Sequence, residues 1–297
     1  MLIDFHAHIF PDKIAERAVA KLTEGTLRIE GRYLPPRGEA TLSGILREMD
    51  KQVSLSLIMP IATSPTQTDN ILSFAERINA RHEDGLRSLL EGRSGDLKEP
   101  LLLSFASLHP DENDVVGRLE DIAERGFLGI KLHPEFQDFY IDSKKSLTIL
   151  QKAEELGLLT VIHAGRDIGM PPPVHATPEA ISHVLGYIEG GHLIAAHLGG
   201  FRMWDDVEKH LVGKPLYFDT AYLGTDDGEP DDAQYLRIIR AHGPRKVLFG
   251  SDYPWKSAGE ALSFLKRLGG AGEPPLSREE LDLITCGNAL RLLSSKR

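Results

Sequence analysis

The 297-residue chain has 34 basic and 44 acidic residues, a net charge of −10, and 41% of its residues are hydrophobic. This composition is typical of a globular protein with a large core, and the lack of a basic block argues against a surface that binds a nucleic-acid backbone. The single cysteine, Cys286, excludes an intrachain disulfide and is compatible with a reducing compartment.

The N-terminal residues do not have the charged and apolar segments of a cleavable leader, and no apolar run has the length of a membrane span. We therefore expect a cytoplasmic protein that acts on a small molecule, with neither a membrane nor a nucleic acid as partner. A homodimer remains open, because no segment identifies an interface by itself.

Eight short apolar runs occur along the chain, and each ends in polar residues. Most of them are continuously hydrophobic, which is typical of strands buried on both faces of a parallel sheet. They cover residues 2–8, 53–60, 101–110, 129–134, 158–165, 193–200, 216–221 and 247–254. Helical periodicity lies between them. Eight alternations of strand and helix predict an α/β fold, a closed (β/α)8 TIM barrel that forms one domain over residues 1–297.

The helical periodicity is clearest over residues 113–125, 143–157 and 177–190, where Asn113 and Thr177 are suited to cap the first and last of these helices. Residues 24–40 are rich in glycine, proline and arginine. They predict an inserted loop after the first strand and its short helix, either a flap over the barrel mouth or an exposed surface loop. Residues 277–293 predict C-terminal helices that pack on the barrel.

Histidine is concentrated at the predicted carboxyl ends of the strands, where the active site of such a barrel lies. The first strand carries His6 and His8, whose i, i+2 spacing places both imidazoles on one face. Two such rings form half of a metal site or a hydrogen-bonded pair. The later strand ends supply Lys131, His133, His163, His197, Asp219 and Asp252. Several histidines and a carboxylate from separate strands favour a site over packing.

This donor set suits Zn²⁺ or a similar divalent ion. Such an ion lowers the pKa of a bound water towards about 7, and a neighbouring carboxylate can accept and return a proton.

These motifs, in this order, resemble those of the amidohydrolase superfamily, specifically the amidohydrolase-related (amidohydrolase 2) group that includes aminocarboxymuconate-semialdehyde decarboxylase. The resemblance extends over nearly the whole chain. It is carried by DFHAH at 4–8, GIKLHP at 129–134, VIHAG at 161–165, AAHLGG at 195–200 and LFGSDYP at 248–254.

The resemblance implies a role for each matching residue. It makes His6, His8, His163 and Asp252 the ligands of one divalent metal ion, most often Zn²⁺ with Mn²⁺ as an alternative. It makes His197 catalytic in the decarboxylase-like members, where this histidine orients or deprotonates the metal-bound water, whereas in binuclear members it binds a second metal. It makes Asp252 a general base as well as a candidate ligand. In binuclear members a lysine at the position of Lys131 is carboxylated and bridges two metals. The decarboxylase-like resemblance instead favours one metal and a free Lys131.

Four residues are candidates for holding the substrate: Lys131, Arg166, His133 and His175. A free Lys131 can bind a substrate carboxylate, and Arg166 can grip one with two hydrogen bonds, although a surface salt bridge is its alternative. His133 shares a face with Lys131, so substrate contact and rim packing are both open. His175 follows three prolines and is either a pocket residue or a helix-entry residue.

We therefore expect a metal-dependent hydrolase or a non-oxidative decarboxylase that acts on a small, carboxylate-bearing molecule. Lactonase and hydratase activities use the same scaffold. A metal-dependent phosphoesterase or nuclease is a further alternative, because these enzymes also begin with Asp-x-His-x-His. The TatD-type nucleases, however, have a glutamate where this chain has Lys131. A non-catalytic barrel that keeps its metal is a third class.

Overall fold

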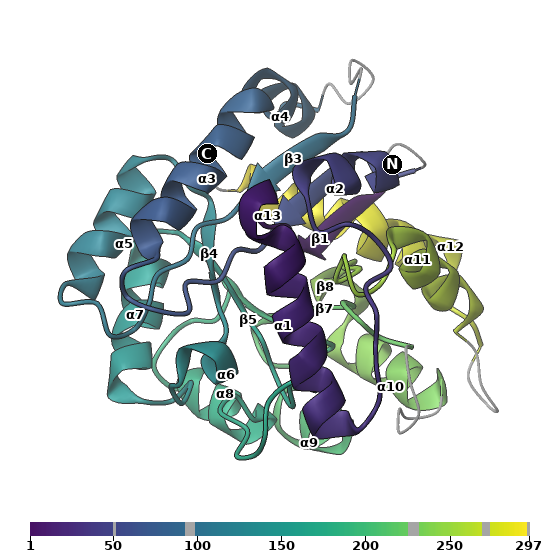
Figure 1. The fold of residues 1–297 in the computed structure, drawn as a ribbon. Helices are drawn as coiled ribbons and strands as arrows, with labels where there is room; N and C mark the ends of the chain where they lie inside the picture. The colour runs from purple at the N-terminus through teal and green to yellow at the C-terminus, as the bar shows by residue number, and fades with distance from the viewer. Residues whose placement is uncertain (50–51, 93–98, 225–231, 269–273, 296–297) are drawn as a thin grey trace.

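The computed structural model describes residues 1–49, 52–92, 99–224, 232–268 and 274–295 (Figure 1). Within these residues eight short parallel strands follow one another around a barrel. They are β1 (Ile3–Ala7), β2 (Leu55–Ile58), β3 (Leu101–Ser104), β4 (Gly129–Leu132), β5 (Leu159–Ile162), β6 (Leu193–Ala195), β7 (Tyr217–Asp219) and β8 (Val247–Leu248). Almost every strand residue is buried, as the continuous apolar runs predict.

The strands form two parallel sheets, β1-β2-β3 and β4 to β8 in sequence order, which backbone contacts join at two seams. At the first seam the Ala106 amide donates to the Gly129 carbonyl at 2.9 Å. At the second seam the Phe5 amide donates to the Phe249 carbonyl at 2.7 Å, and the Asp252 amide donates to the His6 carbonyl at 2.8 Å. The barrel is therefore closed, and the predicted (β/α)8 architecture is confirmed.

Helices follow the strands, and most of them lie around the outside of the barrel (Figure 1). They are α1 (Asp12–Glu30), α2 (Leu42–Met49), α3 (Thr68–Arg81), α4 (Glu83–Leu90), α5 (Val115–Glu124), α6 (Pro134–Gln137), α7 (Lys144–Glu155), α8 (Pro178–Val184), α9 (Trp204–His210), α10 (Asp232–His242), α11 (Ala258–Arg267), α12 (Arg278–Asp282) and α13 (Asn288–Ser294). Short helical turns lie at Pro244–Lys246 and Leu283–Gly287. No described helix is both long and apolar enough to cross a membrane.

The predicted helix caps are partly correct. The Thr177 hydroxyl accepts the Ala180 amide at 3.2 Å and caps α8, as expected, but α8 ends at Val184 rather than near residue 190. The expected cap Asn113 is wrong by one position. Asp114 caps α5 instead, because its carboxylate accepts the Gly117 amide at 2.8 Å. The predicted C-terminal helices are confirmed by α12 and α13.

The expected loop over residues 24–40 is wrong in its first part, because α1 continues to Glu30. Gly25 serves close packing rather than a turn, since a Cβ there would lie 3.2 Å from the Gly169 carbonyl oxygen. The helix ends where Gly31 adopts a φ of 71° and its amide donates to the Leu27 carbonyl.

The segment formed by α1 and the chain up to α2 covers the face where the strands end. The Glu30 carboxylate accepts two hydrogen bonds from Arg202, which follows β6, at 2.9 Å each. The Tyr253 hydroxyl, which follows β8, donates to the Glu39 carbonyl at 2.6 Å. Figure 1 shows α1 lying across the barrel in front of the strands. The flap that the sequence suggested over residues 24–40 is therefore helical as far as Glu30 and non-helical from Gly31 to Ala40.

His242 at the end of α10 gives a prediction about acid stability. Its ring stacks on Phe218 with centroids 3.8 Å apart, and its Nε2 lies 3.0 Å from the Leu216 carbonyl oxygen. Burial lowers the pKa of His242 from 6.5 to about 4. Between these two values the unfolded chain binds the proton and the folded chain does not. The folded state therefore loses stability as the pH falls through this window.

We expect the free energy of unfolding of the wild type, relative to that of His242→Gln, to fall by roughly 2 kcal/mol from pH 7 to pH 5. Urea denaturation at each pH measures it. The exposed His183 on α8 provides the control variant His183→Gln, which should follow the wild type at every pH. If the difference in free energy of unfolding between the wild type and His242→Gln stays constant over this range, protonation of His242 does not destabilise the folded state.

Candidate metal centre

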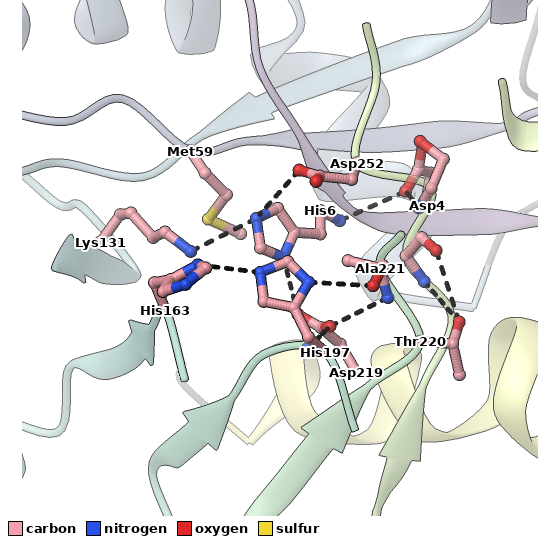
Figure 2. Close-up of polar contacts among 12 residues, drawn as sticks. Asp4, His6, Met59, Lys131, His163, His197, Asp219, Thr220, Ala221 and Asp252 are labelled. Atoms are coloured by element: carbon pink, nitrogen blue, oxygen red, sulfur yellow. Dashed lines mark hydrogen bonds and ion pairs between the residues drawn. The ribbon is translucent and has the colours of Figure 1, made fainter. Parts of the chain in front are cut away.

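Strand ends bring His6, His8 and Asp252 together at the barrel mouth. His6 lies within β1, His8 follows its last residue by one position, and Asp252 follows β8. His6 Nε2 lies 3.1 Å from His8 Nε2, and Asp252 Oδ1 lies 3.2 Å from His8 Nε2 and 3.7 Å from His6 Nε2. One ligand atom from each residue lies within 4.8 Å of the others. Figure 2 shows His6 and Asp252 side by side, with Lys131 directed at His6.

Hydrogen bonds on the opposite side of each ring assign the protons of the two imidazoles. His6 Nδ1 lies 2.7 Å from the Asp219 carboxylate, and His8 Nδ1 lies 2.7 Å from the Met59 carbonyl oxygen. Both partners are acceptors, so each Nδ1 carries a hydrogen. In the neutral rings the two Nε2 atoms then present lone pairs to each other and to the Asp252 oxygen.

Three electron-pair donors so close together are stabilised by a positive charge, which an extra proton on an imidazole, the Lys131 ammonium 3.3 Å from His6 Nε2, or a metal ion can supply. Tetrahedral coordination with metal–nitrogen bonds of about 2.0–2.1 Å separates two ligand nitrogens by about 3.3 Å. The observed 3.1 Å between the two Nε2 atoms is close to this separation. The donor types and their spacing therefore fit a divalent ion.

Electrostatics keep His6 neutral and Asp252 ionised. Burial and the nearby charge of Lys131 lower the pKa of His6 well below its usual value. Burial raises the pKa of Asp252, but its contact with His8 at 3.2 Å and the neighbouring imidazoles outweigh this and lower it. A neutral imidazole and a carboxylate are the protonation states that bind metals.

Lys131 projects from β4 into the same centre. Its side chain is buried, and its Nζ lies 3.3 Å from His6 Nε2. Burial lowers the pKa of Lys131 to about 8, against the raising effects of Asp219 and Asp252. Lys131 is thus a buried cation at neutral pH that lies beside the proposed ligands, where it can meet an anionic group.

His163 and His197 follow β5 and β6 and form the next part of the centre. The His197 ring donates from Nδ1 to the Ala221 carbonyl at 2.9 Å, so its Nε2 is an acceptor. His163 Nδ1 lies 3.0 Å from this Nε2. The His197 ring lies 5.5 Å from the His6 ring, measured between centroids. His163 is therefore linked to the His6 group through His197.

His133, which follows β4, is stacked between two rings rather than directed at His6. Its centroid lies 3.9 Å from that of Phe136 and 4.2 Å from that of His163. Its Nε2 lies 3.3 Å from Asp167, and its Nδ1 accepts the Phe136 amide at 3.4 Å. His133, His163 and Asp167 thus form a second cluster beside the first.

The remaining substrate-binding candidates, Arg166 and His175, are less buried than Lys131. Arg166 has an exposed side chain, and its amide donates to the Phe201 carbonyl at 3.0 Å. His175 is half-buried, and its amide donates to the Glu135 carboxylate at 2.9 Å. Burial raises the pKa of that carboxyl to about 7.

Sequence reasoning missed two of these carboxylates, Asp167 and Glu135. Asp167 lies four residues after His163, and Glu135 lies two residues after His133. This proximity to histidines was the available signal. Asp219, one of the predicted strand-end residues, is hydrogen-bonded to His6 Nδ1 at 2.7 Å. Asp4 accepts the Ser251 amide at 2.8 Å and the Ser251 hydroxyl at 2.5 Å, so it joins β1 to the segment after β8.

A closed (β/α)8 barrel with a histidine- and carboxylate-lined centre at its strand ends defines the structural class of this protein. The amidohydrolase family model matches residues 3–294. The chain therefore belongs to the amidohydrolase family. No curated protein sequence matches it.

Solved structures with the same fold cover nearly the whole chain at low identity. An uncharacterized TIM-barrel protein from Bordetella bronchiseptica has 16% identity and a TM-score of 0.69, with 100% of this chain and 99% of that one covered. A probable 2-pyrone-4,6-dicarboxylic acid hydrolase from Acinetobacter baumannii, with citric acid bound, has 16% identity and a TM-score of 0.63, with 98% of each chain covered.

A third similar structure contains a metal. It is a dihydroxybenzoic acid decarboxylase from Polaromonas sp. JS666 with bound manganese and the inhibitor 2-nitroresorcinol. Its identity to this chain is 13% and its TM-score is 0.57, with 100% of this chain and 97% of that one covered. At these identities the comparisons establish a shared fold.

Proposed function

We propose that this chain is a metal-dependent hydrolase or non-oxidative decarboxylase that acts on a small organic molecule bearing a carboxylate. The observation that carries the proposal is the convergence of His6 Nε2, His8 Nε2 and an Asp252 oxygen beside the buried Lys131. The hydrolase and the decarboxylase with similar folds support both reaction types.

One divalent ion, Zn²⁺ or Mn²⁺, would be held by His6, His8, Asp252 and His163. When bound, such an ion lowers the pKa of a water molecule and polarises a carbonyl group. Asp219 and the Met59 carbonyl fix the orientation of the two β1 imidazoles through their Nδ1–H groups. The neighbouring protein groups then bind the substrate and move its protons.

Three side chains have roles in this scheme. The Lys131 ammonium, desolvated inside the barrel, attracts a substrate carboxylate more strongly than it would in water. The Asp252 carboxylate accepts a proton and returns it to the leaving group in hydrolysis, or to the carbon that loses CO₂ in decarboxylation. His197 presents an unprotonated Nε2, because its Nδ1–H is held by the Ala221 carbonyl, so it can accept or orient a proton.

The alternatives differ in features of this centre. A nuclease is disfavoured by the net charge of −10 and by a lysine where the TatD-type nucleases have a glutamate. Other phosphoesterases would need further acidic metal ligands to hold two or three metals. A binuclear site would need a carboxylated Lys131. The position of Lys131 Nζ, 3.3 Å from His6 Nε2, keeps this second candidate open to test.

Metal content tests the proposed ligands. We expect about one zinc or manganese per chain in protein purified without added metal or chelator, measured by elemental mass spectrometry. His8→Ala should lose the ion, because the substitution removes one of the four proposed ligands. The exposed His183→Ala serves as the control and should keep it.

Two ions per chain that fall to one in Lys131→Met would instead support the binuclear site. No ion in the wild type, even after metal is added, contradicts the proposal.

Substrate screening tests the reaction. We expect the metal-loaded enzyme to act on hydroxybenzoates with CO₂ release, or on lactones and amides of carboxylic acids with acid release in a pH-stat. Lys131→Met should lower kcat/KM by roughly 10- to 100-fold, because a charge-assisted bond to the substrate is lost. Asp252→Asn should abolish turnover. Metal-dependent cleavage of bis(p-nitrophenyl) phosphate alone, lost in Asp252→Asn, would favour the phosphoesterase alternative.

A further inference from the structure

The imidazoles at the centre share one arrangement, in which the nitrogen that faces away from the metal position donates to a protein acceptor. The outward Nδ1 of His6 meets Asp219 at 2.7 Å, that of His8 meets the Met59 carbonyl at 2.7 Å, and that of His197 meets the Ala221 carbonyl at 2.9 Å. Such partners fix the tautomer and the orientation of a ligating ring.

His163 departs from this arrangement. It directs Nδ1 towards the centre, 3.0 Å from His197 Nε2. Its other nitrogen, Nε2, is buried and has no hydrogen-bond partner among the described residues. If Nδ1 binds a metal, the single proton of the neutral ring must lie on Nε2. That proton then needs an acceptor in a place that water does not reach.

Asp167 is positioned to be this acceptor. One of its oxygens lies within 4.8 Å of a ring nitrogen of His163. Its Oδ1 is already held by the Gly169 amide at 2.7 Å, whereas Oδ2 faces the stacked histidines and lies 3.3 Å from His133 Nε2.

The second cluster could instead be a separate metal site, but its ring geometry argues against that. The His133 and His163 rings are inclined by only 14°, with centroids 4.2 Å apart. A ring nitrogen binds metals along its lone pair, which lies in the plane of the ring. Two nearly parallel stacked rings cannot both direct a lone pair at one ion about 2.1 Å away. The cluster therefore suits hydrogen bonding and packing.

We propose that Asp167 is a positioning residue that accepts the Nε2 hydrogen of His163 when Nδ1 binds the metal. His133 supports it by stacking on His163 and by donating from its own Nε2 towards the same carboxylate. Asp167 thereby raises the metal affinity of the centre without contacting the ion. This inference rests on the proposed metal-dependent function.

The test measures metal affinity directly. Metal-free wild type, Asp167→Asn and Asp167→Ala are titrated with Zn²⁺ in competition with a chelating dye. We expect both variants to bind Zn²⁺ roughly 10- to 100-fold more weakly, the alanine variant more so because it has no acceptor oxygen. Co²⁺ loading should give an altered visible absorption spectrum in both variants. The exposed Asp111→Asn is the matched control and should behave as the wild type.

Further measurements separate positioning from a purely structural role. The thermal unfolding midpoint of the metal-free protein should be the same in the wild type and Asp167→Asn. His133→Phe, which preserves the stack, should retain more Zn²⁺ affinity than His133→Ala. Wild-type Zn²⁺ affinity and Co²⁺ spectrum in Asp167→Asn would overturn the inference while leaving the proposed function intact. If His8→Ala and the wild type are equally unable to bind Zn²⁺, the proposed function itself fails.

Discussion

The buried carboxylate of Asp219 is the constraint on which the centre depends. Its Oδ2 holds the His6 ring at 2.7 Å, and its Oδ1 accepts the backbone amides of His197 at 2.8 Å and Ala221 at 3.0 Å. One side chain at the end of β7 therefore fixes a residue of β1, the turn after β6 and its own following turn. A buried anion is costly to desolvate unless such hydrogen bonds compensate it. Here the same bonds that stabilise the charge also set the His6 tautomer and help to place His197.

Parallel closure explains why residues far apart in the sequence meet at this carboxylate. The carboxyl ends of all strands point to the same end of the barrel, so His6 and Asp252 become neighbours across the β1–β8 seam. The strands are only two to five residues long, and much of the centre lies just beyond them. α1 and the chain after it then cover this face, held by the Arg202 pair with Glu30 and by Tyr253. The arrangement gives a desolvated centre in which charges act strongly.

The barrel and the grouping of His6, His8 and Asp252 were predictable from the sequence, because each depends on a local pattern. Buried apolar runs identify the strands, and the residues that end these runs are the ones the barrel gathers. Residues 24–30 were misjudged because Gly25 indicates a turn when it is read locally, whereas it allows α1 to approach Gly169. Asp167 could not be recognised in this way, since its importance depends on its distance from two rings. The exposed side chain of Arg166 is likewise a property of the folded loop.

The group of His6, His8 and Asp252, completed by His163, is the proposed metal centre of an enzyme. Anomalous diffraction from crystals of the zinc-loaded chain, recorded above and below the zinc edge, tests this claim most directly. We expect one strong peak about 2.0–2.2 Å from His6 Nε2, His8 Nε2, His163 Nδ1 and an Asp252 oxygen. A peak centred instead between His133 and Asp167, or zinc bound only at the outer surface of the barrel, would contradict it.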